Sequence, residues 1–171
     1  MKSISIVFSS IVLATTISAQ SLFEMDNISN IEIYFPQDNW NQLMIDNFEA
    51  EEYLLADSVI FNGSMKDSVG VRYKGNSTFS ESNDKNPLNI SIDYIKSNQD
   101  YQGHETIKLS SGQKDPSFLR EALSYEIARK YMEAPRSNYA KVYINGSYHG
   151  LYTNSESVNS DFQNNYLYSD K

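Results

Sequence analysis

The sequence contains no cysteine, one tryptophan and two histidines among its 171 residues. Without cysteine the fold has no disulfides and must be held by its core, and neither thiolate catalysis nor a cysteine-based zinc site is possible. The two histidines lie far apart in the chain, which argues against a histidine-rich metal site. Cations are also scarce. The net charge of −8 predicts no nucleic-acid partner, since proteins that bind phosphate backbones carry basic surfaces, but a local basic pocket is compatible with it.

Only one apolar run is long, and it lies at the start of the chain. Lys2 precedes the apolar residues 4–17, and Ser18-Ala19-Gln20 resembles a signal-peptide cleavage site. We therefore predict a signal peptide at residues 1–19 and an exported protein that is secreted, periplasmic or attached to the cell surface. No later run is long enough to cross a bilayer, so we expect no membrane span after the leader is removed.

Aromatic residues, in contrast, are plentiful. The 13 tyrosines and 8 phenylalanines favour β-rich packing. The clearest local structure is a hairpin with strands at residues 139–144 and 148–153. Asn145-Gly146 joins these strands, and both residues tolerate the positive φ that a tight hairpin turn requires.

Alternation of apolar and polar residues predicts five further strands, at residues 30–35, 53–61, 68–73, 88–94 and 106–109. A loop is expected at residues 62–67, between the second and third of these strands. The segment 36–44 reads as a short helix that begins at Pro36, and residues 157–167 read as a polar, exposed helix.

The longest helix is predicted from Phe118 to Met132. Asp115-Pro116 supplies its start, and Pro135 stops it. Its apolar side chains share one face, which we expect to pack against the sheet; they are Leu119, Ala122, Leu123 and Ile127. Together the elements predict an α+β fold, an antiparallel sheet with hairpins and one long packed helix. After the signal peptide we divide the chain into a strand-helix-strand region at 20–66 and a domain at 67–171.

Three sequence motifs follow one another in that domain. They are Val71-Arg-Tyr-Lys-Gly-Asn-Ser-Thr78, then Lys108-Leu-Ser with Asp115-Pro-Ser-Phe-Leu-Arg-Glu121, and then Ala134-Pro-Arg with the hairpin and Glu156. In this order and spacing they resemble the spore coat protein H (CotH) kinase family. The resemblance implies a fold like the N-lobe of an atypical protein kinase, which transfers the γ-phosphate of ATP to protein serine with Mg²⁺. The implied protein partner is a serine-containing coat or envelope protein.

The resemblance also implies nucleotide-binding residues. Gly75-Asn76-Ser77 matches a loop of the family, which either cradles phosphate with its backbone N–H groups or is simply a turn between strands. Lys85 is the candidate phosphate-contacting lysine, with a solvated loop lysine as the alternative. Glu121 would hold that lysine, as the helix glutamate of kinases does, or would be an acid favoured near a helix N-terminus.

Arg72 and Glu156 complete the predicted nucleotide-binding set. Arg72 would contact phosphate or cover the sheet, and Glu156 would meet the ribose or base, or be a surface glutamate. One departure concerns Asn89, which stands where the family often has a second lysine. No His-Arg-Asp occurs, and Asp161-Phe-Gln163 lacks the glycine of the metal-binding Asp-Phe-Gly. We therefore predict no catalytic and no metal-binding residue in this chain.

These departures predict that the chain is the N-terminal portion of a CotH-like kinase, truncated at its C-terminus and inactive alone. A second interpretation is a non-catalytic coat, surface-adhesion or matrix-binding protein of the same fold. A third is a carbohydrate-binding β domain, suggested by the tyrosine content. Resemblance of fold does not separate them, because function resides in the site.

Overall fold

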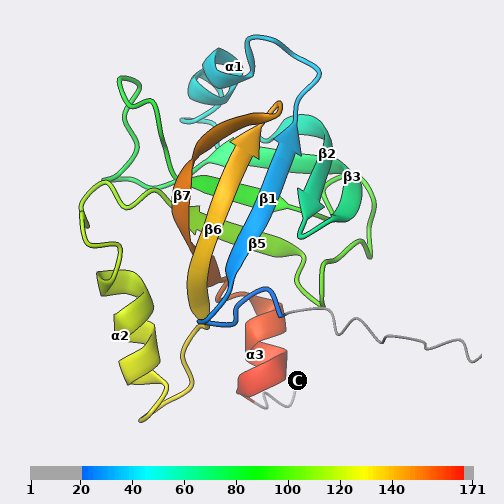
Figure 1. Ribbon diagram of the computed structural model, residues 1–171. Helices are drawn as coiled ribbons and strands as arrows, with labels where there is room; N and C mark the ends of the chain where they lie inside the picture. The colour runs from blue at the N-terminus through cyan, green and yellow to red at the C-terminus, as the bar shows by residue number, and fades with distance from the viewer. Residues whose placement is uncertain (1–20, 168–171) are drawn as a thin grey trace, which may run out of the picture.

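The computed structural model describes residues 21–167, so the leader predicted at residues 1–19 lies outside the described residues. Within them the chain forms seven strands and three short helices (Figure 1). In chain order these are β1 (Ile28–Tyr34), α1 (Trp40–Asp46), β2 (Leu54–Phe61), β3 (Ser64–Tyr73), β4 (Leu88–Ser91), β5 (Thr106–Ser110), α2 (Arg120–Ala128), β6 (Ser137–Ile144), β7 (Ser147–Glu156) and α3 (Ser160–Tyr166).

The strands close into a barrel in the order β1-β2-β3-β4-β5-β7-β6. Neighbouring strands are antiparallel, except that β1 pairs in parallel with β6 from Ile28 opposite Tyr139 to Ile33 opposite Ile144. Closure turns one face of every strand inward, so alternate side chains fill the interior. The interior includes Ile31, Val71 and Val142, each with no exposed surface.

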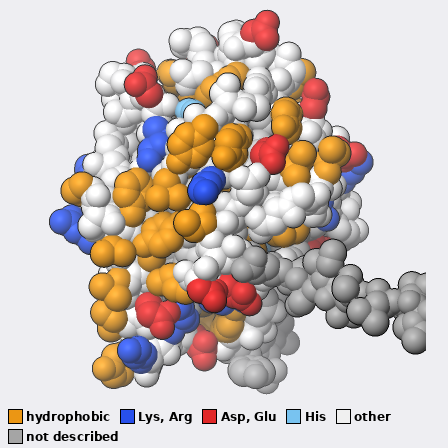
Figure 2. Space-filling model, in the orientation of Figure 1, with side chains coloured by type: hydrophobic (Ala, Val, Ile, Leu, Met, Phe, Trp, Pro, Cys, Tyr) orange, Lys and Arg blue, Asp and Glu red, His pale blue; other side chains and the backbone are white. Residues whose placement is uncertain are grey.

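The predicted α+β fold, an antiparallel sheet with hairpins and one long packed helix like the N-lobe of an atypical protein kinase, is therefore wrong. α2 has nine residues, and of the four apolar side chains expected on the sheet only Ala122 is buried, whereas Leu119, Leu123 and Ile127 are 56%, 50% and 49% exposed. Figure 2 shows hydrophobic side chains along the lower left of the molecule, where Figure 1 places α2. The physical reason is that the sheet curls on itself and buries its apolar face in its own interior, so that face needs no covering helix.

Backbone conformation shortens the helix at its start. Phe118 has a φ of +58°, which a right-handed helix does not allow, so α2 begins at Arg120. The Asp115 carboxylate still serves this end, because its Oδ2 accepts the Arg120 N–H at 2.7 Å. The helix predicted at residues 157–167 is confirmed as α3, but Phe162 is buried in it and not exposed.

Two hairpin turns have the same sequence, Asn-Gly. The turn predicted at Asn145-Gly146 is confirmed, with φ values of +47° and +78°. Asn62-Gly63 forms a second one, with φ values of +49° and +86°. The loop expected at residues 62–67 is therefore wrong, because β3 begins directly after this turn at Ser64.

The barrel takes strands from both sides of the division predicted between residues 66 and 67. β1 and β2 precede this point, and β3 runs across it from Ser64 to Tyr73. The boundary between a region at 20–66 and a domain at 67–171 stays a prediction. Among the described residues, no helix combines the length and the apolar character needed to cross a membrane.

A buried amide ties the segment before β1 to the open end of the barrel. Asn138 Nδ2 donates to the backbone oxygens of Leu22, Glu24 and Asn27 at 2.9, 3.0 and 3.1 Å. Asn154 Nδ2 donates to Asn138 Oδ1 at 2.9 Å and so fixes the orientation of that amide. Both asparagine side chains have no exposed surface. The amide of Asn138 thus gives these backbone carbonyls hydrogen-bond donors inside the protein, where they have less access to water.

We expect Asn138→Asp to lower the free energy of unfolding by about 3 kcal/mol. The variant keeps the shape of the side chain but replaces its donors with acceptors that face buried carbonyl oxygens. Urea unfolding followed by circular dichroism measures the change. Asn164→Asp on the exposed side of α3 is the control and leaves the unfolding midpoint almost unchanged. Equal midpoints for the two variants would contradict the role given to Asn138.

Candidate functional site

A row of polar side chains crosses the outer surface of β3, β4, β5 and β7. Arg72 lies opposite Asn89, Asn89 lies opposite Lys108, and Lys108 lies opposite Ser155. Side chains in register on neighbouring strands point to the same face, and the residues that alternate with them belong to the buried interior. The row therefore places two cations and an amide side by side outside the barrel.

Lys74 extends this row at the end of β3. It lies two residues beyond Arg72 on the same face, and its backbone N–H donates to Pro87 O at 3.0 Å. Burial lowers the pKa of Lys74, the negative charge of Glu121 opposes that shift, and the positive charge of Lys108 adds to it. Lys74, Lys108 and Glu121 thus interact electrostatically within one site.

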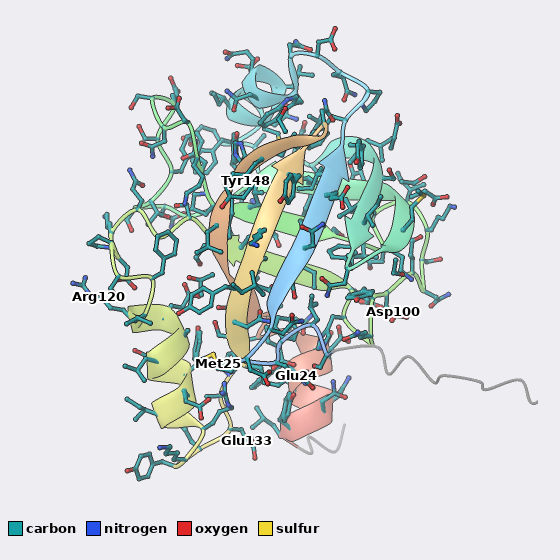
Figure 3. The ribbon with its side chains drawn as sticks, viewed as in Figure 1. Glu24, Met25, Asp100, Arg120, Glu133 and Tyr148 are labelled. Atoms are coloured by element: carbon teal, nitrogen blue, oxygen red, sulfur yellow. The ribbon has the colours of Figure 1, made fainter. Side chains whose placement is uncertain are left out.

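Glu121 reaches the row from the first turn of α2. Its Oε1 accepts a hydrogen bond from Ser155 Oγ at 2.7 Å, which holds the carboxylate over β7. α2 stands beside the barrel next to β6 and β7 (Figure 1). Arg120, the residue before it, points away from the barrel into solvent (Figure 3). Glu121 therefore belongs to the polar row, and Arg120 does not.

A hollow of about 210 Å³ adjoins the row, between the turn after β3, the end of β5 and the start of α2. The residues that line it are Thr78, Pro87, Ser110, Ser111, Gly112, Gln113, Lys114, Asp115, Arg120, Glu121 and Thr153. Ser111 is only 2% exposed, and its Oγ has no hydrogen-bond partner among the described residues. In the row, Arg72 Nε and Asn89 Oδ1 are likewise buried without a partner among the described residues, although Arg72 Nη2 pairs with Glu51 Oε2 at 3.1 Å and Asn89 Nδ2 donates to Tyr53 OH at 2.9 Å. Buried polar atoms without partners are uncommon, so this surface has unused capacity for a polar ligand.

The predicted loop Gly75-Asn76-Ser77 forms a tight turn at the rim of this hollow. Gly75 has a φ of +96°, and a Cβ there would collide with the Thr78 hydroxyl, so the turn requires glycine. Phe79 N–H donates to Gly75 O at 3.1 Å and closes the turn. Asn76 and Ser77 are exposed, and Thr78 is the residue of this turn that lines the hollow.

Lys85 lies apart from Glu121. Its Nζ donates to Leu151 O at 3.0 Å and lies over the rings of Phe118 and Tyr152, at 4.9 and 5.2 Å from their centroids. Burial lowers its pKa. The Lys85 chain crosses Gly150, where a Cβ would lie 2.7 Å from Lys85 Cδ. The described residues contain no ion pair between Lys85 and Glu121, and the lysine whose pKa the charge of Glu121 raises is Lys74.

Sequence reasoning missed Lys74 and Lys108, although a signal for both was present. Lys108 lies between the buried Ile107 and Leu109, and Lys74 directly follows β3, two residues after Arg72. The signal for both lysines is their alternation with buried apolar residues, which places them on the outer face of the sheet. Lys74 and Lys108 come together only through the register of β3, β4 and β5, which cannot be read from the sequence.

Glu156 is enclosed on the other side of β7. It is 4% exposed, and Arg136 binds both of its carboxylate oxygens, with NH2 at 3.0 Å from Oε1 and Nε at 3.3 Å from Oε2. Tyr166 of α3 donates to Oε1 at 3.2 Å, and His104 lies 4.0 Å away. Burial alone would raise the pKa of Glu156, but the hydrogen bonds and charge of Arg136 hold it below its ordinary value. The structure does not bring Glu156 to the Lys74–Glu121 row.

The structure therefore assembles part of the predicted set. Arg72 and Glu121 share the row with Lys74 and Lys108, although Arg72 is also ion-paired with Glu51 at 3.1 Å, and the Gly75 turn stands at the rim of the hollow. Lys85 and Glu156 have other partners. Among the residues the structure describes, no three His, Asp or Glu side chains group as metal ligands would. The site offers cations and hydroxyls, which suit an oxyanion such as phosphate.

A family model described as CotH kinase protein matches residues 71–171, which begin inside β3 and include the whole polar row. No curated protein matches the sequence. The match covers more than half of the chain.

The free energy of unfolding should fall as the pH drops below about 6.5. Burial lowers the pKa of His104 and of His149, the two histidines of the chain, so the folded state favours their neutral forms. A lowered pKa contributes stability that is complete above the ordinary value of 6.5 and is lost as the pH falls through the folded value. Glu156, whose pKa is also lowered, adds a further loss below its ordinary 4.5.

Urea unfolding at a series of pH values measures both steps. The double variant His104→Gln/His149→Gln should lose the step that begins near pH 6.5 and keep the decline below about 4.5. Each single variant should lose part of the upper step. An unchanged upper step in the double variant would assign it to groups other than the histidines.

Proposed function

This chain belongs to the CotH kinase protein family, and on that premise we propose that it is the ATP-binding part of an exported protein kinase. The complete kinase would transfer the γ-phosphate of ATP to serine in a coat or envelope protein. Residues of the polar row would hold the phosphates of the nucleotide. The observation that carries the proposal is that Lys74 and Lys108, two cations with one acidic neighbour, share a surface of an acidic chain.

Charge supports a phosphate ligand in this position. The chain carries a net charge of −8, yet Arg72, Lys74 and Lys108 lie together on one face. Burial lowers the pKa of Lys74, so holding its charge there has a cost in free energy that a bound anion would offset. Phosphate oxygens also accept strong hydrogen bonds from ammonium, guanidinium and hydroxyl groups, and the buried Ser111 Oγ and Arg72 Nε have such capacity unused.

Each residue of the row then has a distinct task. Lys74 and Lys108 supply positive charge to the phosphates, and Glu121, held by Ser155, orients the ammonium of Lys74. Ser111 and Thr78 offer hydroxyl donors from the hollow. The chemistry that Mg²⁺ would supply to the complete kinase is neutralisation of the charge on the transferred phosphate. The described residues gather no ligand set for this ion, so it enters the proposal without an assigned site.

We expect Lys74→Met and Lys108→Met each to weaken ATP binding by about tenfold to a hundredfold. Each substitution removes a charge-assisted hydrogen bond to phosphate, worth about 1.5–3 kcal/mol. Isothermal titration calorimetry with ATP measures the dissociation constants. The matched control is Lys66→Met, which removes the same charge from the other end of β3.

The control and a third variant decide between explanations. Equal losses in the Lys66 variant would mean that general charge and not a site attracts the nucleotide. Lys85→Met tests the lysine predicted from sequence, which the structure places on Leu151 O, and we expect a smaller loss than for Lys74→Met. Absence of ATP binding by the unmodified chain would contradict the proposal of a nucleotide site. It would favour the second interpretation, a non-catalytic coat, surface-adhesion or matrix-binding protein.

The chain should bind ATP without transferring its phosphate. Transfer to serine needs a positioned base and carboxylates for metal, and the described residues do not gather such a set. Incubation with ATP labelled at the γ-phosphate and a serine-rich protein substrate measures transfer. Labelling of the substrate well above that seen with the Glu121→Gln variant would contradict this expectation.

A further inference from the structure

A second polar surface lies on the outer face of β1 and β6. Its side chains alternate with the buried Ile31, Ile33 and Val142, and the register places Asn30 opposite Lys141 and Glu32 opposite Tyr143. The helices that the structure describes stand at the top, the left and the bottom of the view and leave these two strands uncovered (Figures 1 and 2). We call this area the β1–β6 face; it consists of Asn30, Glu32, Tyr34, Lys141, Tyr143 and Tyr148.

Glu32 is held in one orientation at the centre of the β1–β6 face. Asn30 Nδ2 donates to its Oε1 at 2.8 Å, and Tyr34 OH donates to its Oε2 at 2.9 Å. Each carboxylate oxygen accepts more than one hydrogen bond, so both keep capacity for a ligand. A carboxylate fixed by two neighbours on a rigid ladder is preorganised for binding.

Two tyrosine rings stand beside this carboxylate. Tyr143 and Tyr148 meet edge to face, with centroids 5.4 Å apart and planes at 62°. Tyr148 remains 58% exposed and lies on the β6–β7 hairpin, near its turn (Figure 3). A hollow of about 380 Å³ is lined by Asn30, Glu32, Tyr34, Tyr143 and Gly146, a size within the range of small-molecule sites.

The chemistry of these groups specifies the ligand. Glu32 accepts hydrogen bonds, Lys141 and the Asn30 amide donate them, and the charges of Glu32 and Lys141 balance. A ligand that matches them carries no net charge and presents donors and acceptors together, as hydroxyl groups do. The exposed tyrosine ring offers a flat apolar face. A pyranose ring combines hydroxyls at its rim with an apolar C–H face.

We propose that the β1–β6 face binds a neutral saccharide chain. The Tyr148 ring stacks on the C–H face of one sugar, and Glu32 accepts hydrogen bonds from its hydroxyls. This contact would attach the protein to a polysaccharide while the polar row on β3, β4, β5 and β7 stays free. The proposal does not rest on ATP binding, because the two surfaces share no residue.

The test uses the mature chain and three neutral probes: cellohexaose, xylohexaose and N-acetylchitohexaose. Saturation-transfer-difference NMR detects binding, and titration gives the dissociation constant. At least one probe should bind. Tyr148→Ala and Glu32→Gln should each weaken that binding by about tenfold, and Tyr148→Phe, which keeps the ring, should retain it. The control is Tyr131→Ala, which removes another tyrosine, 85% exposed, away from the β1–β6 face.

Three results would overturn the proposal. The first is no binding of any probe at millimolar concentration by the unmodified chain. The second is an equal loss in the Tyr131 variant, which would make the effect nonspecific. The third is binding of hexa-arginine that Glu32→Gln abolishes while the sugars fail to bind, which would identify the face as a site for basic peptides. Urea unfolding of each variant confirms that a lost signal reflects binding and not loss of the fold.

Discussion

The parallel ladder between β1 and β6 is the contact on which the rest of the structure depends. It joins a strand near the start of the described chain to one near its end, and it is the parallel pairing among the described strands of the closed barrel. Closure removes both sheet edges and lets the apolar faces of seven strands bury one another. The buried amide of Asn138, at the start of β6, then fastens the segment before β1 across the end of the barrel.

Apolar side chains fill most of the interior, and strand register sorts the polar side chains of the outer surface into two sites. The row of Arg72, Lys74 and Lys108 gathers positive charge in a chain of net charge −8, and two acids moderate it, Glu51 beside Arg72 and Glu121 of α2. The β1–β6 face gathers balanced charge and aromatic rings instead. This difference in charge is why we propose phosphate for the first and neutral sugar for the second.

Adjacent residues of β7 show how strictly the strand separates roles. Ser155 points outward and binds Glu121 of the polar row, whereas Glu156 points to the other side, where Arg136, Tyr166 and His104 enclose it. A shift of one residue in the pairing would exchange these environments and bury the wrong groups. The hydrogen bonds at Glu156 thus help to fix the register that positions Ser155.

The sequence by itself determined the local elements and the family. Alternation indicated the strands and Asn145-Gly146 the hairpin, because these depend on neighbours along the chain, and the motifs from Val71 to Glu156 carried the resemblance that the family match confirms. Tertiary structure alone decided the barrel and the composition of the sites. Glu121 acts electrostatically on Lys74, whereas Lys85 binds Leu151 O. α2 leaves most of its apolar side exposed. Both results follow from pairings between distant strands. Such pairings are set by the mutual burial of whole strand faces, which no local pattern of residues encodes.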